Sequence, residues 1–147
     1  MPKDPQQNTA GLVIKSMKQK FKIKSGIEIK IKKGVPAGFG MGSSAASAVA
    51  AALAFNKLFN LKLDNKTLIK CAGIGEKASA GTIHYDNVAA SLLGGFVVVK
   101  TKPFDVIRLE PPKDLVLCVA IPKLKVPKKK TKAVSYTHLT LPTILLV

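Results

Sequence analysis

The chain has 147 residues, of which 47% are hydrophobic, so it can bury the core of one domain and is too apolar to be disordered. Lys and Arg number 24 against 8 Asp and Glu, a formal net charge of +16 at pH 7, which permits a nucleotide, a nucleic acid or a membrane surface as partner. Specific nucleic-acid binding is disfavoured, because every basic residue except Arg108 is Lys and aromatic residues make up only 5%, whereas base readers usually rely on Arg and stacked rings.

Neither cysteine has the spacing of a metal or redox motif, so we expect Cys71 and Cys118 to be reduced thiols in the core, without a disulfide or zinc. The N-terminus carries no apolar h-region and no lipidation signal, which indicates a cytoplasmic protein. The most apolar predicted helix, Ala45 to Phe55, is shorter than the roughly 20 residues that cross a bilayer, so no membrane partner is expected.

The first predicted element is a helix over Asp4 to Phe21, where apolar residues recur near helical spacing and Asn8 suits the N-cap. After Gly26, the alternation of Ile with Glu and Lys from Ile27 to Ile31 predicts a strand with one apolar face. That strand would deliver Lys33 to the edge of the loop that follows. For Lys33, a solvated side chain and a phosphate contact both stay open.

A glycine-rich loop then leads into a run of small apolar residues, read GVPAGFGMGSSAASAVAAALAFNKLF from Gly34 to Phe59. Every second residue from Gly38 to Gly42 is glycine, so the backbone can adopt positive φ and bring its N–H groups close to an anion. We expect Ser43 or Ser44 to be the N-cap of the next helix, whose unpaired first-turn N–H groups and partial positive charge also favour an anion. This order of elements predicts a phosphate site.

Two familiar glycine motifs do not match this loop. A P-loop has Lys directly before its Ser or Thr, whereas this chain has Gly42 before Ser43. The dinucleotide fingerprint needs its third glycine two residues later than Gly42. The predicted phosphate site is therefore of another type.

Two helices are predicted after the loop. Ala45 to Phe55 is apolar on every face, so we expect this helix to be buried beneath a sheet. The second helix spans Asp64 to Ala78, with Asp64 as its N-cap. Glu76 falls on the apolar face of that helix, where a carboxylate is costly unless it is paired or metal-bound, although a rotation of about 60° would place it at the surface.

Three functional side chains, His84, Asp86 and Asn87, lie within four residues before a short apolar helix, Val88 to Leu93, and a glycine pair. Polar groups in this position either cap a helix or line a pocket, and Asp86 suits the cap.

The last part of the chain is predicted to form strands, over Phe96 to Thr101, Val106 to Leu109 and the apolar run Leu115 to Ile121. A solvated basic connector, Lys123 to Lys132, follows. Helices and strands together predict an α+β domain.

The glycine loop resembles the PxxxGLGSSAA signature of the GHMP kinases, because Pro36 and the run Gly40 to Ala46 match it and only Met41 replaces the usual Leu. The string HxDNVAxSLLGG, which begins at His84, is similar to the motif of the homoserine kinases within that superfamily. The resemblance implies a GHMP kinase N-terminal domain with an α+β, ribosomal protein S5 domain 2-like fold. It implies a domain over residues 1–134 that is incomplete at both ends, and a tail over 135–147 that is unlike the family.

The resemblance also implies a nucleotide site. Ser44 and Glu76 would hold Mg²⁺ on the phosphates of ATP, and Lys33 would neutralise their charge. Asn8 would lie near the adenine, with the N-cap role described above as the alternative. The implied nucleotide-binding residues are Asn8, Pro36, Ala37, Gly38, Phe39, Gly40, Met41, Gly42, Ser43, Ser44, Ala45 and Ala46.

The implied reaction transfers the γ-phosphoryl group of ATP to the hydroxyl of L-homoserine, a step of threonine biosynthesis. His84 and Asn87 would contact the substrate, and Asn87 would orient its hydroxyl. Asp86 is the candidate base, although the resemblance to homoserine kinases implies that no protein base is needed. Lys33 is the third expected catalytic residue.

Other functions stay open at this point. Another small-molecule GHMP kinase, such as a mevalonate kinase, is one alternative, and a basic S5-like RNA-binding module is another. We expect the 147-residue chain to be inactive alone, and a homodimer of the full-length form is open.

Overall fold

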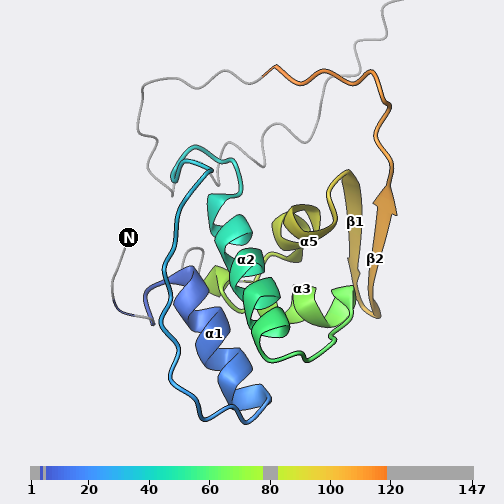
Figure 1. Ribbon diagram of the computed structural model, residues 1–147. Coiled ribbons are helices and arrows are strands. Elements are labelled where there is room, and N and C mark those ends of the chain that lie inside the picture. The colour runs from blue at the N-terminus through green and yellow to red at the C-terminus, as the bar shows by residue number, and fades with distance from the viewer. Residues whose placement is uncertain (1–3, 5, 78–82, 119–147) are drawn as a thin grey trace, which may run out of the picture.

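The computed structural model describes residue 4 and residues 6–77 and 83–118. Its elements in chain order are α1 (Thr9–Lys20), α2 (Ser43–Leu58), α3 (Asn65–Gly73), α5 (Tyr85–Leu93), β1 (Phe96–Thr101) and β2 (Phe104–Leu109). The helices pack together, and the two strands form a hairpin beside α5 and α3 (Figure 1). A mixed α and β architecture was predicted, and the described part of the chain confirms it.

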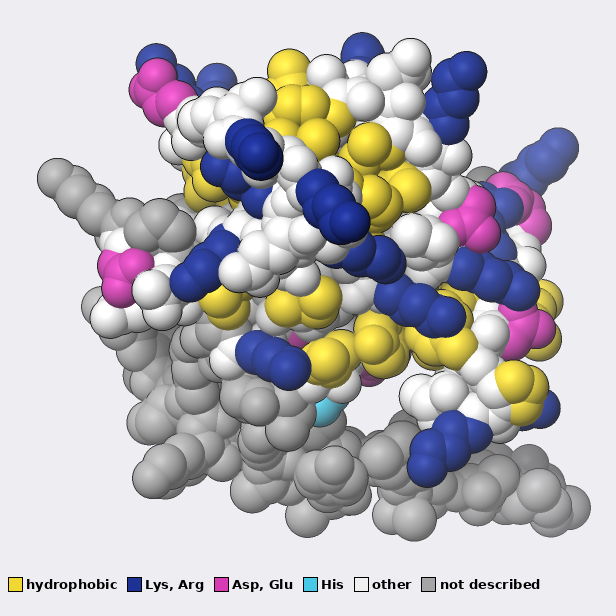
Figure 2. Space-filling view, turned by 90° about the horizontal axis from the view of Figure 1, so that it is seen from below, with side chains coloured by type: hydrophobic (Ala, Val, Ile, Leu, Met, Phe, Trp, Pro, Cys, Tyr) yellow, Lys and Arg dark blue, Asp and Glu magenta, His cyan; other side chains and the backbone are white. Residues whose placement is uncertain are grey.

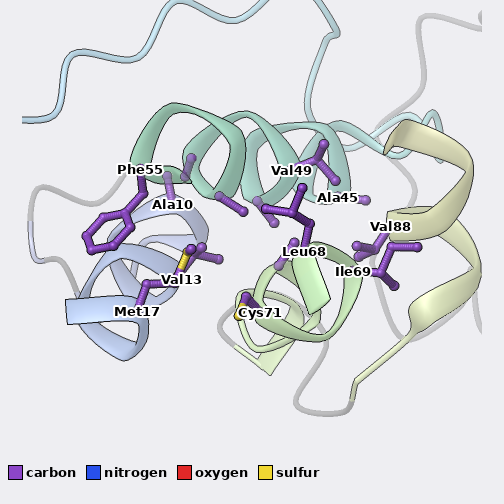
Figure 3. Close-up of a cluster of buried hydrophobic side chains, with 14 of the residues drawn as sticks. Ala10, Val13, Met17, Ala45, Val49, Phe55, Leu68, Ile69, Cys71 and Val88 are labelled. Carbon is purple, nitrogen blue, oxygen red and sulfur yellow. The ribbon is translucent and has the colours of Figure 1, made fainter. Parts of the chain in front are cut away.

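The hydrophobic core lies on one side of α2, where α1, α3 and α5 all contact it (Figure 3). Phe55 of α2 meets Met17 of α1, and Ile69 of α3 lies near Val88 of α5; all four side chains are fully buried. Burying a side chain of this size contributes about 1.5 to 3 kcal/mol relative to leaving it in water. Among the described residues, the core therefore lies between four helices, and α2 contacts each of the other three.

The expectation that α2 is buried on every face is wrong. Its far side is open, with Leu53 42% exposed and Ala50 and Ala54 exposed as well. The other helices all lie on one side of α2, and no sheet covers the open side within the described residues. Small apolar residues thus form both the core face of α2 and a second, open face.

The starts of α1 and α3 follow the predicted capping chemistry. The Asn8 side chain accepts hydrogen bonds from the backbone N–H groups of Ala10 and Gly11 at 3.0 and 3.3 Å, so α1 begins at Thr9 and not at Asp4. Asp64 caps α3 as predicted, and hydrogen bonds from Thr67 lower the pKa of its carboxyl group. In both helices an orphan backbone donor is satisfied by a side-chain oxygen.

α3 ends at Gly73, earlier than predicted, and the chain turns through Gly75 before it is helical again at Glu76. A Cβ atom on Gly73 would lie 2.6 Å from the Tyr85 ring, and one on Gly75 would lie 2.8 Å from the Thr9 carbonyl oxygen. Only glycine fits these two approaches, which tie the turn to the starts of α5 and α1. The predicted helix end at Ala78 lies outside the described residues.

β1 and β2 pair in antiparallel register from Phe96↔Leu109 to Thr101↔Phe104, so both predicted strands are confirmed. Lys66 of α3 forms an ion pair with Asp105 at 2.8 Å, and the Lys70 ammonium lies over the Phe104 ring. The Arg108 side chain donates to the carbonyl oxygens that end α5. These contacts hold the hairpin against the helices.

Two predicted strands are absent from the described sheet. Residues Ile27 to Ile31 are extended but take part in no ladder, and the segment runs unpaired alongside α1 and α2 (Figure 1). Leu115 to Cys118 is also irregular and exposed, so the expectation that Cys118 is a core thiol is wrong, whereas Cys71 is buried. Residues 119–121, the connector and the tail lie outside the described part of the chain.

Candidate functional site

The glycine loop has the backbone conformation that its sequence predicts. Gly38, Gly40 and Gly42 have φ values of 91°, 71° and 65°, which L side chains rarely adopt. Gly42 is itself the N-cap of α2, in a left-handed conformation, so the predicted Ser cap is wrong. Without a capping side chain, the first-turn N–H groups of α2 keep their capacity to bind a ligand.

Lys33 and Ser43 meet at the start of α2. The Lys33 ammonium donates to the Ser43 hydroxyl at 3.0 Å and to the Ser43 carbonyl oxygen at 3.3 Å. The Ser43 hydroxyl in turn donates to the Val35 carbonyl oxygen at 2.8 Å. A cation therefore lies at the positive end of a helix dipole, an arrangement that an anion would stabilise.

The two serines of the loop have different environments. Ser43 is 8% exposed and its hydroxyl is engaged by Lys33 and Val35, so it connects the loop to the segment before it. Ser44 is half-buried, and no protein contact within the described residues uses its hydroxyl. Ser44 is thus the serine whose hydroxyl can take a ligand.

A groove of about 310 Å³ extends from this point along the open face of α2. Its other wall is the extended segment from Ile29 to Val35, and Ala10 of α1 also lines it. Ligand pockets start at about this volume. The α2 wall consists of small residues: Ser43, Ala46, Ser47, Ala50, Ala51 and Ala54.

Sequence reasoning missed this groove. An apolar run such as Ala45 to Phe55 predicts a helix covered on every face, although Ala46, Ala50 and Ala54 recur every four residues and leave a shallow helix face. That spacing is the signal that could have indicated a groove. The end at Lys33 suits an anionic group and the α2 wall suits an uncharged one, while Lys30 and Lys32 line the opposite wall.

Glu76 is 4% exposed, so the prediction that its carboxylate lies on the apolar side of the chain is confirmed. Its neighbour Gly75 packs on Thr9, next to Asn8. The described residues contain no group of three or more His, Cys, Asp and Glu side chains that could hold a metal. A carboxylate and a hydroxyl, as in Glu76 and Ser44, fit Mg²⁺ only if the ion takes its other ligands from phosphates and water, which is its usual habit.

His84, Asp86 and Asn87 lie together at the start of α5, and all three are exposed. His84 is the N-cap residue, whereas Asp86 is inside the first turn, so the predicted Asp86 cap is wrong. Negative charge there is favoured by the helix dipole. These residues, like Glu76, take no part in the contact between Lys33 and Ser43.

The glycine loop, the uncapped α2 N-terminus and Lys33 form the kind of site that suits an anionic ligand. The family model described as the GHMP kinases N terminal domain matches residues 8–95. The chain belongs to the GHMP kinase family.

Named relatives agree with this assignment. The chain is 48% identical over 132 residues to a homoserine kinase of Thermoplasma volcanium, covering 90% of this chain and 42% of that protein. It is 50% identical over 115 residues to a homoserine kinase of Methanopyrus kandleri, covering 78% of this chain and 38% of that protein. The chain thus spans about two fifths of the length of the curated relatives it matches.

A solved structure is similar as well. The crystal structure of homoserine kinase from Cytophaga hutchinsonii superposes with a TM-score of 0.79 at 37% identity, covering 90% of this chain and 42% of that one. The fold of a GHMP kinase N-terminal domain is therefore confirmed. Among the described helices, none has the length and apolar character needed to cross a membrane.

Proposed function

We propose that this chain is the nucleotide-binding part of a homoserine kinase, which transfers the γ-phosphoryl group of ATP to the hydroxyl of L-homoserine. The observation that carries the proposal is the convergence of three glycines at positive φ, an uncapped α2 N-terminus and the Lys33 ammonium on one point. The relatives' names support the reaction and the acceptor. Because its substrates are small soluble molecules, we place this enzyme in the cytoplasm.

In this proposal the phosphates of ATP lie against the loop from Pro36 to Gly42 and the first turn of α2. Backbone N–H groups and the Lys33 ammonium offset the negative charge that phosphoryl transfer carries, and positioning does the rest of the catalysis. Ser44 and Glu76 would hold Mg²⁺, which when bound neutralises phosphate charge. Ser43 keeps Lys33 at the loop through its hydroxyl.

The rest of the nucleotide follows the groove along α2. Ala10 lines the groove, and Asn8 lies two residues before it, so the adenine near Asn8 and the phosphates near Ser43 are joined by one surface. Asn8 also caps α1, and its side-chain oxygen already accepts two backbone bonds.

The acceptor would lie at the start of α5. His84 and Asn87 present exposed polar side chains there, which suits an amino-acid substrate and its hydroxyl. Asp86 is exposed in the first turn of the same helix. Asn87 cannot act as a base because its amide has no proton affinity at neutral pH, so it orients the hydroxyl while the phosphate takes the proton.

Two assays test the proposal. A coupled assay should detect ADP release that depends on L-homoserine in a version extended to the relatives' length, and mevalonate-dependent release would instead support another GHMP kinase. A titration of RNA into the chain tests the binding-module alternative, since such binding would fall steeply with salt. Figure 2 shows lysines spread over one face with apolar side chains between them, which supports small-molecule binding over an RNA track.

A further inference from the structure

Tyr85 is the first residue of α5, and its side chain faces the helix core. It is half-buried, and Val88 and Ala89, three and four residues further on, are fully buried. Asp86 and Asn87, in the same turn, are exposed. Because successive residues of a helix are about 100° apart, the place where the Tyr85 ring packs decides the direction in which Asn87 points.

The Tyr85 ring is held by two other elements. It lies against the backbone of α3, where a Cβ atom on Gly73 would be only 2.6 Å from the ring atom Cε1. From the start of β2, the Phe104 ring meets it edge to face, with centroids 5.1 Å apart and planes at 69°. This is a favoured geometry for an aromatic pair. We call Gly73, Tyr85 and Phe104 the aromatic clamp.

Two lysines of α3 bind the same end of the hairpin. Lys66 forms its ion pair with Asp105, and the Lys70 ammonium lies 4.8 Å from the centroid of the Phe104 ring. The two side chains of the ion pair are 55% and 48% exposed, and exposed ion pairs contribute little to stability. The packing of the rings, and not the ion pair, therefore decides where Tyr85 lies.

We propose that the aromatic clamp positions the acceptor site of the kinase, with Tyr85 and Phe104 acting through the first turn of α5. This inference rests on the proposed function, in which His84 and Asn87 contact L-homoserine. His84 comes directly before Tyr85 and Asn87 two residues after it, so a shift of the ring moves both. Among the described residues no hydrogen bond uses the Tyr85 hydroxyl, so we assign the positioning role to the ring.

Steady-state kinetics of a version extended to the relatives' length test this role. Phe104→Leu keeps an apolar side chain but removes the ring that contacts Tyr85. A misplacement of about 1 Å can cost about a hundredfold in rate, and the loss of one support should move the turn by less, so we expect kcat/KM for L-homoserine to fall about tenfold. The KM for magnesium ATP should stay near the wild-type value, because no contact of the clamp involves the glycine loop.

Gly73→Ala perturbs the clamp from α3. It leaves both rings in place, but its Cβ atom would displace the Tyr85 ring, whereas alanine by itself favours a helix over glycine. We therefore expect the same kinetic change as in Phe104→Leu, a lower kcat/KM for L-homoserine with little change for magnesium ATP. The two variants reach the ring from different elements, so their agreement would support the clamp.

Control variants separate the clamp from general destabilisation. Phe59→Leu removes another half-buried ring, which packs on Phe55 with centroids 4.7 Å apart at the C-terminal end of α2. It should lower Tm as Phe104→Leu does and leave the kinetics for both substrates unchanged. Lys66→Met removes only the ion pair and Tyr85→Phe only the hydroxyl, so both should keep wild-type kinetics.

Hydrogen exchange followed by mass spectrometry measures the clamp without any catalysis. In Phe104→Leu, the backbone amides of α5 should exchange faster than in the wild type, while those of α1 keep their protection. Unchanged exchange in α5 would show that the ring does not hold this helix, and the proposal would fail.

The kinetic outcomes distinguish the clamp from the proposed function. Wild-type kinetics in Phe104→Leu and Gly73→Ala would overturn the clamp and leave the kinase proposal intact. Equal losses for both substrates, or the same losses in Phe59→Leu, would indicate a general effect on the fold and contradict the clamp. A loss in Tyr85→Phe would assign the role to the hydroxyl and not to the ring. An extended wild-type version that releases no ADP with L-homoserine would overturn the proposed function, and the role of the clamp at the acceptor with it.

Discussion

Removing one hydroxyl at a time from the paired serines should separate a structural role from a binding role. Ser43→Ala removes the group that donates to Val35 at 2.8 Å and accepts from Lys33 at 3.0 Å. Each hydrogen bond contributes about 0.5 to 1.5 kcal/mol, so we expect a loss of about 1 to 3 kcal/mol in the free energy of unfolding. For a chain of this size that lowers Tm by about 3 to 9 °C.

Ser44→Ala should leave stability within about 0.5 kcal/mol, because no described protein contact uses this hydroxyl. If Ser44 binds magnesium nucleotide, its loss should weaken affinity by about 1.5 to 3 kcal/mol, or roughly 10- to 150-fold. Thermal denaturation and calorimetric titration with magnesium ATP measure the two quantities. Ser91→Ala on the exposed side of α5 is the control for hydroxyl removal from a helix.

The reasoning would be refuted by the reverse pattern. If Ser43→Ala keeps the wild-type Tm, the contact with Lys33 and Val35 does not stabilise the loop. If Ser44→Ala binds magnesium ATP as tightly as the wild type, Ser44 is not part of the nucleotide site. A version extended to the relatives' length serves for the titration if the 147-residue chain binds ATP too weakly to measure.

Three further perturbations follow from the structure. Gly42→Ala should cost about 1 to 2 kcal/mol in denaturant unfolding, because the left-handed φ of 65° strains a side chain even where nothing lies within 4 Å, and Gly42→Asn should cost less. Hydrogen bonds from Thr67 lower the pKa of the Asp64 carboxyl group. The ionised cap should therefore stabilise the fold above about pH 4, and this stabilisation should disappear as the pH falls through the lowered pKa. Asp64→Asn should remove that part of the pH dependence of Tm. Asp86→Asn, in a version extended to the relatives' length, should lower kcat less than the 10²- to 10⁴-fold typical of a lost base, and a larger loss with the acidic limb gone from the pH profile would make Asp86 the base.

Local chemistry explains what the sequence predicted well. The positive φ values from Gly38 to Gly42, the Asp64 cap and the β1–β2 hairpin depend on residues close together in the chain, and all three appear in the structure. Glu76 is also on the buried side, as its position in the predicted apolar face indicated. The roles of these residues in binding and catalysis stay predictions.

The incorrect predictions depend on partners. An alternating run such as Ile27 to Ile31 becomes a strand only when another strand supplies its hydrogen bonds, and the described sheet contains only β1 and β2. The same holds for Leu115 to Cys118, where an apolar run is exposed. The Ser cap of α2 failed for a different reason, since Gly42 already has a conformation that ends the loop and leaves both serines inside the helix.

The distribution of charge along the groove argues for a nucleotide over a polyanion. A nucleic acid carries one phosphate per residue, so its binding groove needs cations along its whole length. Here the ammonium of Lys33 and the α2 N-terminus lie at one end, and the α2 wall beyond them consists of small uncharged residues, while Lys30 and Lys32 line only the opposite wall. A molecule with phosphates at one end and a flat, weakly polar base at the other matches that sequence of surfaces. The basic side chains spread over the face seen in Figure 2 then raise the local concentration of any anion without selecting one.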